Sequence, residues 1–227
     1  MIAVVTLAGL FSFAGQGDPV GVQALISSGD YEAAISTLEK TLQRGEKGRE
    51  HEEAALTLAE CYLSMGLFAR AGEALELLAP RVSESSRRRY VLAEVLASRG
   101  KTAEAEKILA SLSGEEGFPG ATFRLSVLSF ERGDYKKAEE LLAALAESGS
   151  LDYYGEIYRA RSLLALDRAS EASVVLASLG KNHDTPEVRY LAGRVSLLLR
   201  KPGLAAEQFR RALTVNSDYL EAAFSLA

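Results

Sequence analysis

The sequence contains no tryptophan, one cysteine, two histidines and five prolines among its 227 residues. The lone cysteine, Cys61, excludes an internal disulfide and a zinc cluster of thiolates, but it leaves the cellular compartment open. His51 and His183 are far apart in the chain, and neither stands beside a residue that would complete a catalytic pair. No nucleophile elbow, phosphate-binding loop or metal-ligand spacing occurs. The sequence therefore predicts a protein that is not an enzyme and that needs no cofactor and no metal.

An excess of positive charge is also absent. The chain has 26 basic and 31 acidic residues, a net charge of -5, so it lacks the basic stripe that neutralises phosphates in a nucleic-acid binder. The densest basic run, Arg87 to Arg89, points in three directions on a helix, which predicts a solvated surface rather than a phosphate site. Cys61 lies inside a predicted helix, where a buried thiol is favoured over a nucleophile. We expect a protein or peptide partner and no nucleic acid.

The longest apolar run, Ile2 to Ala14, is shorter than the ~20 residues that span a bilayer. Its length and the small residues Ser12 and Ala14 are typical of a secretory signal, which predicts a signal-like segment at 1–17 and a periplasmic or exported protein. No Lys or Arg precedes the run. Two alternatives therefore stay open: an apolar helix docked on the first repeat, or an artefactual start, either of which fits a cytoplasmic protein. Any membrane association would depend on this segment.

A period near 34 residues organises the rest of the chain. Turn residues 37, 34, 33, 34 and 33 positions apart are each followed five positions later by alanine: Gly29 and Ala34, Gly66 and Ala71, Gly100 and Ala105, Gly133 and Ala138, Asp167 and Ala172, Arg200 and Ala205. Two helical stripes fit within each period, which predicts an all-α solenoid of antiparallel helix pairs held together by neighbouring repeats.

The residue types around each turn support this hairpin. Glycine accepts the positive φ of a tight turn, and alanine is small where two helices approach closely. Nine residues after each turn the chain carries a large apolar residue that we expect to fill the space between hairpins: Leu38, Leu75, Leu109, Leu142, Leu176 and Phe209. Thr185 is an expected N-cap before Pro186. Asp167 and Arg200 stand where glycine is expected and are irregular joints.

The array is predicted to cover 18–227. Its approximate repeats are 18–51, 52–85, 86–118, 119–152, 153–185 and 186–219, with a partial seventh at 220–227. Because that seventh unit begins a first helix and then stops, we expect the chain to be a fragment of a longer array.

The motif Gly133-Asp134-Tyr135-x-x-Ala138, the segment 202–213 and the segment 218–227 resemble the tetratricopeptide repeat (TPR) family. The resemblance covers roughly 18–227 and implies a right-handed superhelical solenoid that binds proteins without catalysing a reaction. The chain departs from the family pattern in lacking tryptophan, in missing most of the prolines that end the second helix, and in the turn residues Asp167 and Arg200.

In this family the first helix of each pair lines a concave groove at positions thirteen, ten, six, three and two before the turn. The resemblance therefore implies a groove that includes Tyr90, Glu94, Phe123, Val127, Phe130, Tyr154, Arg161, Tyr190 and Arg194. Ten before the turn, Tyr90, Phe123 and Tyr190 form an aromatic ladder. The alternative is that these rings are interhelical packing.

Six positions before the turn the sign of the charge changes, from Glu60 and Glu94 through Val127 to Arg161 and Arg194. Such a groove would orient a bound segment by its charges. The alternative is a solvated face. The family's carboxylate clamp needs Lys and Asn where this chain carries Leu56, Glu60, Tyr90 and Glu94, so chaperone-tail binding is not expected.

The sequence thus favours a non-catalytic interaction scaffold of a bacterial cell envelope, which binds a peptide or protein segment in its groove. Two alternatives remain: the substrate-recruiting arm of a larger enzyme, and a cytoplasmic assembly adaptor.

Overall fold

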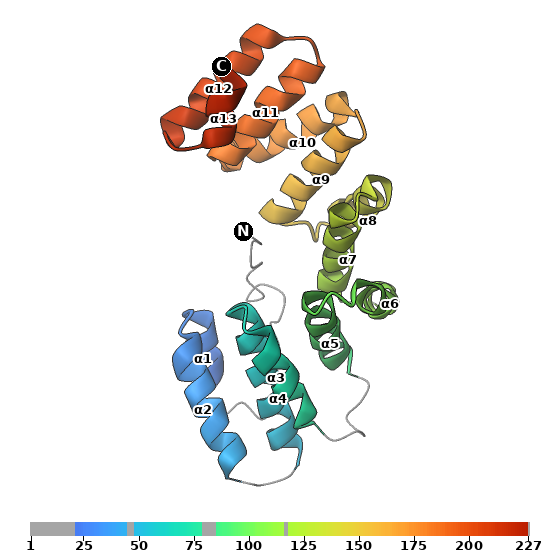
Figure 1. Cartoon of the computed structure of the whole chain (residues 1–227), viewed down its shortest axis with the longest axis vertical. Coiled ribbons are helices and arrows are strands. Elements are labelled where there is room, and N and C mark those ends of the chain that lie inside the picture. Colours follow the sequence, from blue (N-terminus) through green and yellow to red (C-terminus); the bar gives the residue numbers. More distant parts are fainter. Residues whose placement is uncertain (1–20, 45–47, 79–84, 116–117, 227) are drawn as a thin grey trace. The chain divides into compact units, whose positions relative to one another are not determined.

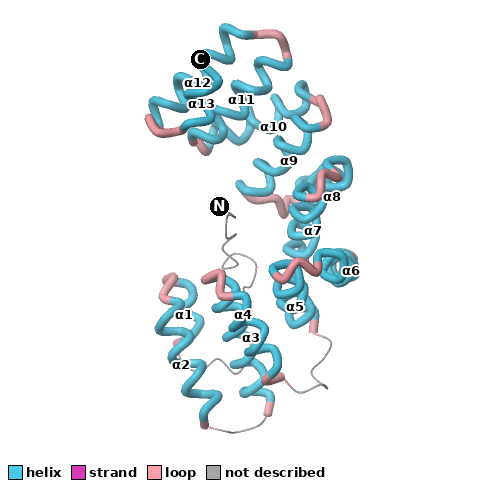
Figure 2. The backbone as a smooth tube through the Cα atoms, in the orientation of Figure 1, coloured by secondary structure: helices cyan, strands magenta, loops and turns pink. Residues whose placement is uncertain are grey.

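The computed structural model describes residues 21–44, 48–78, 85–115 and 118–226, which contain helices and no strands (Figures 1 and 2). The signal-like segment 1–17 lies outside the described residues. The helices are α1 (Val22–Ser27), α2 (Tyr31–Gln43), α3 (Arg49–Ser64), α4 (Phe68–Glu76), α5 (Ser86–Ser98), α6 (Thr102–Ser113), α7 (Pro119–Glu131), α8 (Tyr135–Glu147), α9 (Tyr153–Ala165), α10 (Ala169–Asn182), α11 (Pro186–Leu198), α12 (Pro202–Val215) and α13 (Leu220–Leu226).

The chain divides into two compact units, Met1–Ala121 and Thr122–Ala227, and each is described by itself. In unit 1, α2 packs on α3, and α5 packs on α3, α4 and α6. In unit 2, each helix from α9 to α12 packs on the helices before and after it, and α9 also contacts α11. Neighbouring helices therefore supply the tertiary contacts of each unit, as a repeat fold requires. Helix α3 begins at Arg49, ahead of the expected repeat boundary at 52.

All six periodic turn positions adopt left-handed backbone conformations. The four glycines have φ between 72° and 84°, while Asp167 and Arg200 have φ of 57° and 58°. In each turn the N–H of the following residue donates to the carbonyl five residues earlier, as in the 2.8 Å bond from Lys201 to Ser196, which is the Schellman pattern. The predicted glycine turns are confirmed, and the two non-glycine joints keep the same geometry.

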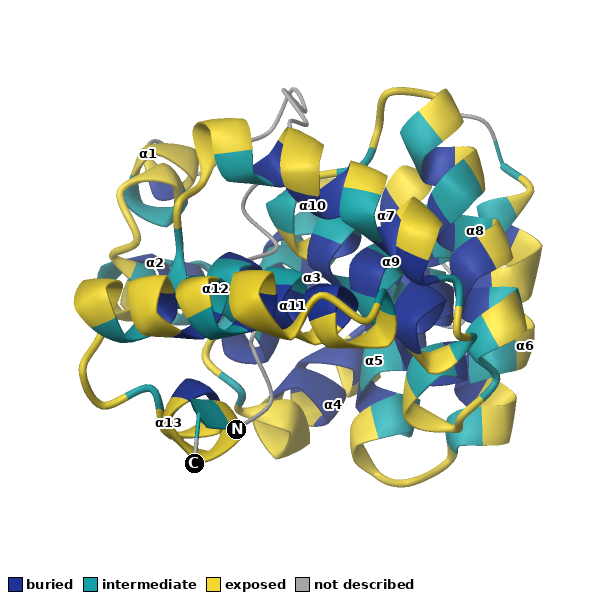
Figure 3. Ribbon diagram, turned by 90° about the horizontal axis from the view of Figure 1, so that it is seen from above, coloured by how far each residue is buried: buried dark blue, intermediate teal, exposed yellow. Residues whose placement is uncertain are grey.

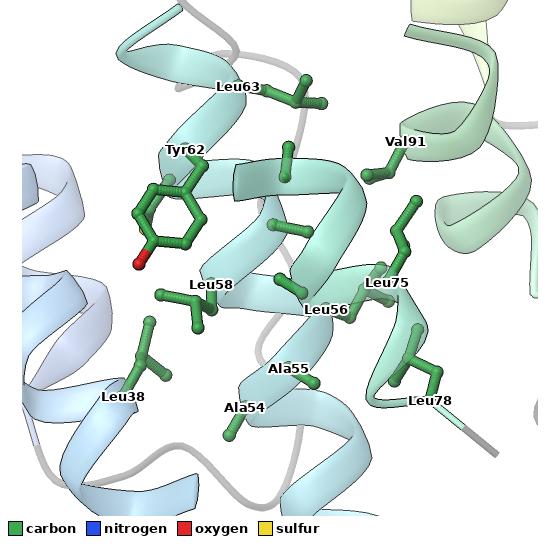
Figure 4. Close-up of a cluster of buried hydrophobic side chains, with 14 of the residues drawn as sticks. Leu38, Ala54, Ala55, Leu56, Leu58, Tyr62, Leu63, Leu75, Leu78 and Val91 are labelled. Atoms are coloured by element: carbon green, nitrogen blue, oxygen red, sulfur yellow. The ribbon is translucent and has the colours of Figure 1, made fainter. Parts of the chain in front are cut away.

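Side chains at fixed offsets from these turns fill the contacts between helices. The alanine five residues after each turn is at most 1% exposed, and the large apolar residue nine after it is at most 8% exposed. In Figure 3 the buried residues form stripes along the helices, with exposed residues on the opposite sides. Figure 4 shows one such cluster in unit 1, where Leu38 of α2 lies near Leu58 of α3, and Leu75 of α4 faces Val91 of α5.

Polar caps begin five of the helices. The side chains of Asp30, Ser85, Asp134, Asp152 and Thr185 each accept a hydrogen bond from the backbone N–H three residues later. The expected N-cap at Thr185, followed by Pro186 in the first helical turn, is confirmed. These caps fix where α9 and α11 begin, and both helices line the candidate site.

Candidate protein-interaction site

Unit 2 contains a hollow of about 350 Å³, named here the unit 2 pocket, between the end of α7, the start of α8, and α9 and α11. It is lined by Phe130, Tyr135, Arg161, Leu164, Ala165, Tyr190, Leu191 and Arg194. Four of the residues predicted to line the groove, namely Phe130, Arg161, Tyr190 and Arg194, are therefore brought together here. The volume lies within the range of ordinary ligand pockets.

Aromatic rings form the rigid part of the unit 2 pocket. The ring of Phe130 packs edge-on against those of Tyr135 and Tyr158, with centroids 5.2 and 5.4 Å apart. The ring of Tyr190 lies 5.9 Å from that of Phe209 and 5.7 Å from that of Tyr219. Rings held by such neighbours lose little freedom when a ligand binds, because their rotamers are already fixed.

Two arginines add positive charge to this apolar wall, and they differ in their partners. The guanidinium of Arg161 pairs with the Glu187 carboxylate and lies 6.0 Å from the centre of the Tyr158 ring. Arg194 is exposed and pairs with no carboxylate among the described residues. Arg194 is thus the cation of the pocket that is available to an acidic ligand.

The other predicted groove residues have different surroundings. Tyr154 is 42% exposed and packs on Tyr153, but it does not line the unit 2 pocket. Phe123 and Val127 are 9% and 4% exposed, and the ring of Phe123 meets that of Tyr158 at 6.1 Å. For Phe123, the interhelical-packing alternative describes the observed environment, and the Val127 side chain is buried as well.

In unit 1, Tyr90 is 3% exposed and its ring lies 5.6 Å from that of Phe118. Glu94 lies half-buried on α5. Of the three rings in the predicted ladder, Tyr190 lines the unit 2 pocket, whereas Tyr90 and Phe123 are buried against neighbouring rings. The role of the full set of predicted residues in binding stays a prediction.

The expected solvated surface at Arg87 is wrong. Its guanidinium donates to Glu60 from Nε at 2.7 Å and from Nη2 at 2.6 Å, and to Glu53 from Nη1 at 2.7 Å. The Arg87 and Glu60 side chains are only 18% and 11% exposed. Burial raises the pKa of Glu60, and the hydrogen bonds and charge of Arg87 partly offset that increase.

The pairs in the two units occupy equivalent positions in the repeat. Arg87 stands thirteen residues before its turn and binds Glu60, which stands six before the preceding turn. Glu187 and Arg161 occupy the same two positions in unit 2 with the charges exchanged. The predicted change of sign along the groove therefore includes charges that neighbouring repeats neutralise.

Cys61 and His183 carry side chains of types that can take part in catalysis or metal binding. Cys61 is 1% exposed, and burial raises its pKa to about 12, so little thiolate forms near neutrality. The His183 ring packs on Tyr153. Within the described parts of the chain, no three His, Cys, Asp or Glu side chains gather as metal ligands. In those same parts, no helix combines the length and the apolar character needed to cross a membrane.

Paired helices, left-handed turns at a fixed period and contacts between neighbours define an all-helical repeat protein of the solenoid class. Two family models described as tetratricopeptide repeat match residues 25–95 and 90–153, which together cover more than half of the chain. The chain belongs to the tetratricopeptide repeat family, and the predicted fold class is confirmed. No curated protein matches the sequence.

Several solved structures share the fold. YrrB, described as a TPR protein with an unusual peptide-binding site, is 16% identical with a TM-score of 0.66, over 84% of this chain and 98% of YrrB. PilF of Pseudomonas aeruginosa is 15% identical with a TM-score of 0.73, over 89% of this chain and 92% of PilF. A chain of the APC/C hetero-tetramer Cut9–Hcn1 is 16% identical with a TM-score of 0.72, over 90% of this chain but 40% of that chain.

Proposed function

We propose that this protein is a non-catalytic scaffold that holds a segment of another protein in the unit 2 pocket. Tetratricopeptide repeats imply a protein-interaction role. The finer assignment rests on one observation: the exposed guanidinium of Arg194 has no carboxylate partner within the described parts of the chain, and Arg194 lines the same pocket as the ring of Tyr190. The peptide-binding site of YrrB, a protein of the same fold, supports a peptide as the ligand.

The pocket favours a segment with an apolar side chain next to an acidic one. The apolar side chain would lie against Phe130 and Tyr190, while the carboxylate would pair with Arg194. A guanidinium binds a carboxylate through two parallel hydrogen bonds, which gives direction as well as affinity. Because Arg161 is paired with Glu187, it would form part of the pocket wall, and Arg194 would make the main contact with the ligand carboxylate.

A display library of random peptides tests this proposal without a known partner. The library is selected on the protein and, in parallel, on the double variant Arg194→Glu with Tyr190→Ala. We expect peptides with Asp or Glu beside an aliphatic or aromatic residue to be enriched on the original protein, and to bind the variant roughly 10-fold or more weakly, since a charged hydrogen bond contributes about 1.5–3 kcal/mol.

A matched control variant distinguishes loss of the Arg194 contact from the change in the net charge of the protein. Lys107→Glu changes the net charge of the protein by the same amount as Arg194→Glu, but at an exposed lysine of α6 in unit 1. This control variant should keep the affinity for the selected peptides within about 2-fold of the original. If both selections gave the same peptides, the unit 2 pocket would not be the binding site.

We also propose that the protein is exported and works in the cell envelope. This proposal rests on the apolar run and the small residues of segment 1–17, which lies outside the described residues. N-terminal sequencing of the mature protein tests it, with an expected first residue just after Ala14. Retention of Met1 would favour the cytoplasmic adaptor instead.

A further inference from the structure

A second hollow of about 370 Å³ lies in unit 2 between α10, α11 and α12, and is named here the α10–α12 cleft. Helix α11 contributes to both hollows. Because an α-helix turns about 100° per residue, Tyr190 and Arg194 lie on one side of α11, while Val188, Ala192 and Val195 lie on roughly the opposite side. The α10–α12 cleft is therefore separate from the unit 2 pocket.

The floor of the cleft is apolar. Leu176 of α10 and Val188 and Val195 of α11 are 4%, 2% and 3% exposed, and all three line the cleft. Leu204 of α12 stands at the rim and is 43% exposed. An apolar side chain placed here would exchange water for contacts with these residues.

A glycine keeps this cleft open without being needed for packing. Gly180 lies within α10 and has no positive φ, so its backbone does not require glycine. A Cβ at this position would lie 3.7 Å from Cγ1 of Val188, an ordinary contact. Glycine weakens a helix relative to alanine. The helix thus gives up stability at a position where the missing side chain leaves room for a ligand.

Two exposed lysines border the apolar floor of the cleft. Lys181 and Lys201 line the cleft, are exposed, and pair with no carboxylate in the described part of the chain. Arg189 also lines it, but its Nε is 2.5 Å from Asp184 and its Nη1 donates to Gln208 at 3.2 Å. The two lysines would attract a partner that carries carboxylates around an apolar residue.

We propose that the α10–α12 cleft is a second protein-binding surface, which takes a segment with a branched apolar side chain flanked by acidic residues. This second binding surface goes beyond the proposed function, because the segment bound in the α10–α12 cleft would bind at the same time as a ligand of the unit 2 pocket. The scaffold would then bring two partners to opposite sides of α11.

The probe is a fluorescent acidic peptide, Glu-Glu-Leu-Leu-Glu-Glu, in which one leucine is replaced by a photoreactive diazirine analogue. Its counterpart has lysine in place of every glutamate. We expect the acidic peptide to bind at least 10-fold more tightly by fluorescence anisotropy, and its crosslinks, mapped by mass spectrometry, to lie on α10 and α12. Crosslinks confined to α9 and the Arg194 side of α11 would overturn the proposal, as would equal binding of the two peptides.

Variants test the charge and the open space separately. Reversing both lysines, Lys181→Glu with Lys201→Glu, should weaken binding of the acidic peptide at least 10-fold. The matched control Lys40→Glu with Lys107→Glu carries the same change in charge on exposed lysines of unit 1 and should change binding less than 2-fold. Equal loss in both double variants would overturn the proposal.

Gly180→Ala should weaken binding about 3-fold or more while thermal stability stays equal or rises, because alanine favours the helix and fills the cleft. Unchanged binding would show that the space is not used. Arg194→Glu alters the unit 2 pocket only, so it should leave the crosslinks on α10 and α12 intact. The proposal for the α10–α12 cleft can therefore fail while the proposed function of the unit 2 pocket holds, and the reverse is also possible. Binding of phosphatidylglycerol vesicles in place of the acidic peptide would overturn the assignment to a protein partner.

Discussion

Units 1 and 2 contain the same pair of repeat positions joined by an ion pair, but they use it differently. In unit 1 the side chain of Arg87 is 18% exposed and binds two carboxylates, whereas in unit 2 the side chain of Arg161 is 41% exposed and binds one. The buried pair belongs to the contact between repeats, and the open pair borders a pocket. Burial, rather than position in the repeat, therefore decides whether a charge of the first helix is structural or accessible.

The largest expected effect comes from breaking the buried pair. Arg87→Met should lower the free energy of unfolding by about 3 kcal/mol, because it leaves the Glu60 carboxylate buried without its partner. Arg161→Met should cost about 0.5 kcal/mol, since its pair is open to water. Urea denaturation followed by circular dichroism measures both. Equal losses in the two variants would contradict the comparison.

The pH dependence of the Arg87→Met loss sharpens the same point. Burial raises the pKa of Glu60 in the folded protein, so the stability contributed by this group is present below its unfolded pKa and is lost as the pH rises through its folded pKa. Without Arg87 the folded pKa rises further, and each additional unit adds about 1.4 kcal/mol to the loss at pH 7. The destabilisation should therefore be smaller at pH 5 than at pH 7.

Glu60→Gln supplies the control for this pH effect. In the double variant Arg87→Met with Glu60→Gln, the loss relative to Glu60→Gln alone should be the same at both pH values, because the titrating group is gone. A pH-dependent difference in that background would assign the effect to another carboxylate.

The turns offer a second contrast between the units. All three periodic turns described in unit 1 use glycine, while unit 2 uses Gly133, Asp167 and Arg200 at positive φ. A left-handed conformation costs an ordinary L-residue about 1–2 kcal/mol, and glycine loses part of that advantage through its unfolded-state entropy. Arg200→Gly should therefore raise the free energy of unfolding by about 0.5–1 kcal/mol, and Asp167→Gly by less, since Asp tolerates this region better.

The reverse substitution checks the direction. Gly133→Ala should lower the free energy of unfolding by about 1 kcal/mol, measured by the same denaturation. Destabilisation by Arg200→Gly would mean that the arginine side chain contributes more than its backbone conformation costs.

The smallest expected effect is the coupling within the open pair. A double-mutant cycle of Arg161→Ala and Glu187→Ala should give an interaction energy of about 0.5 kcal/mol, because both side chains reach water. Exchanging the pair, Arg161→Glu with Glu187→Arg, would give unit 2 the polarity of unit 1 and should restore most of the stability that either single change removes. A coupling above about 2 kcal/mol would place this pair in the same class as Arg87 and Glu60.

The repeat, the hairpins and their inner residues could be predicted from the sequence because each depends on contacts at fixed offsets. Ala172 and Leu176, for example, follow Asp167 at the same distances as in repeats with a glycine turn, and both are buried. The geometry of Asp167 itself was harder to predict. Its left-handed conformation, which Asp tolerates better than most residues, follows from its place in the period and is not identified by its residue type alone.

The site was predicted in part. Phe130, Arg161, Tyr190 and Arg194 follow from the family register, but the burial of Tyr90 depends on Phe118, which precedes α7 and lies outside that register. The ion pairs between repeats did leave a signal in the sequence. Opposite charges at six before one turn and thirteen before the next would have identified both pairs.

The α10–α12 cleft was missed because the register of the groove concerns first helices, whereas α10 and α12 are second helices. Its signal was Gly180, a glycine within an amphipathic helix without a turn to explain it.

The contacts between neighbouring helices have a mechanical consequence. Because each helix from α9 to α12 packs mainly on the helices next to it in the chain, a pull on the two ends of this described part of unit 2 would load one helix–helix contact after another. Under tension the helix pairs would unfold one after another, and the chain would lengthen in small steps at modest force. A partner bound across successive pairs would act as a brace, and the force needed for each step would then report whether that partner is present.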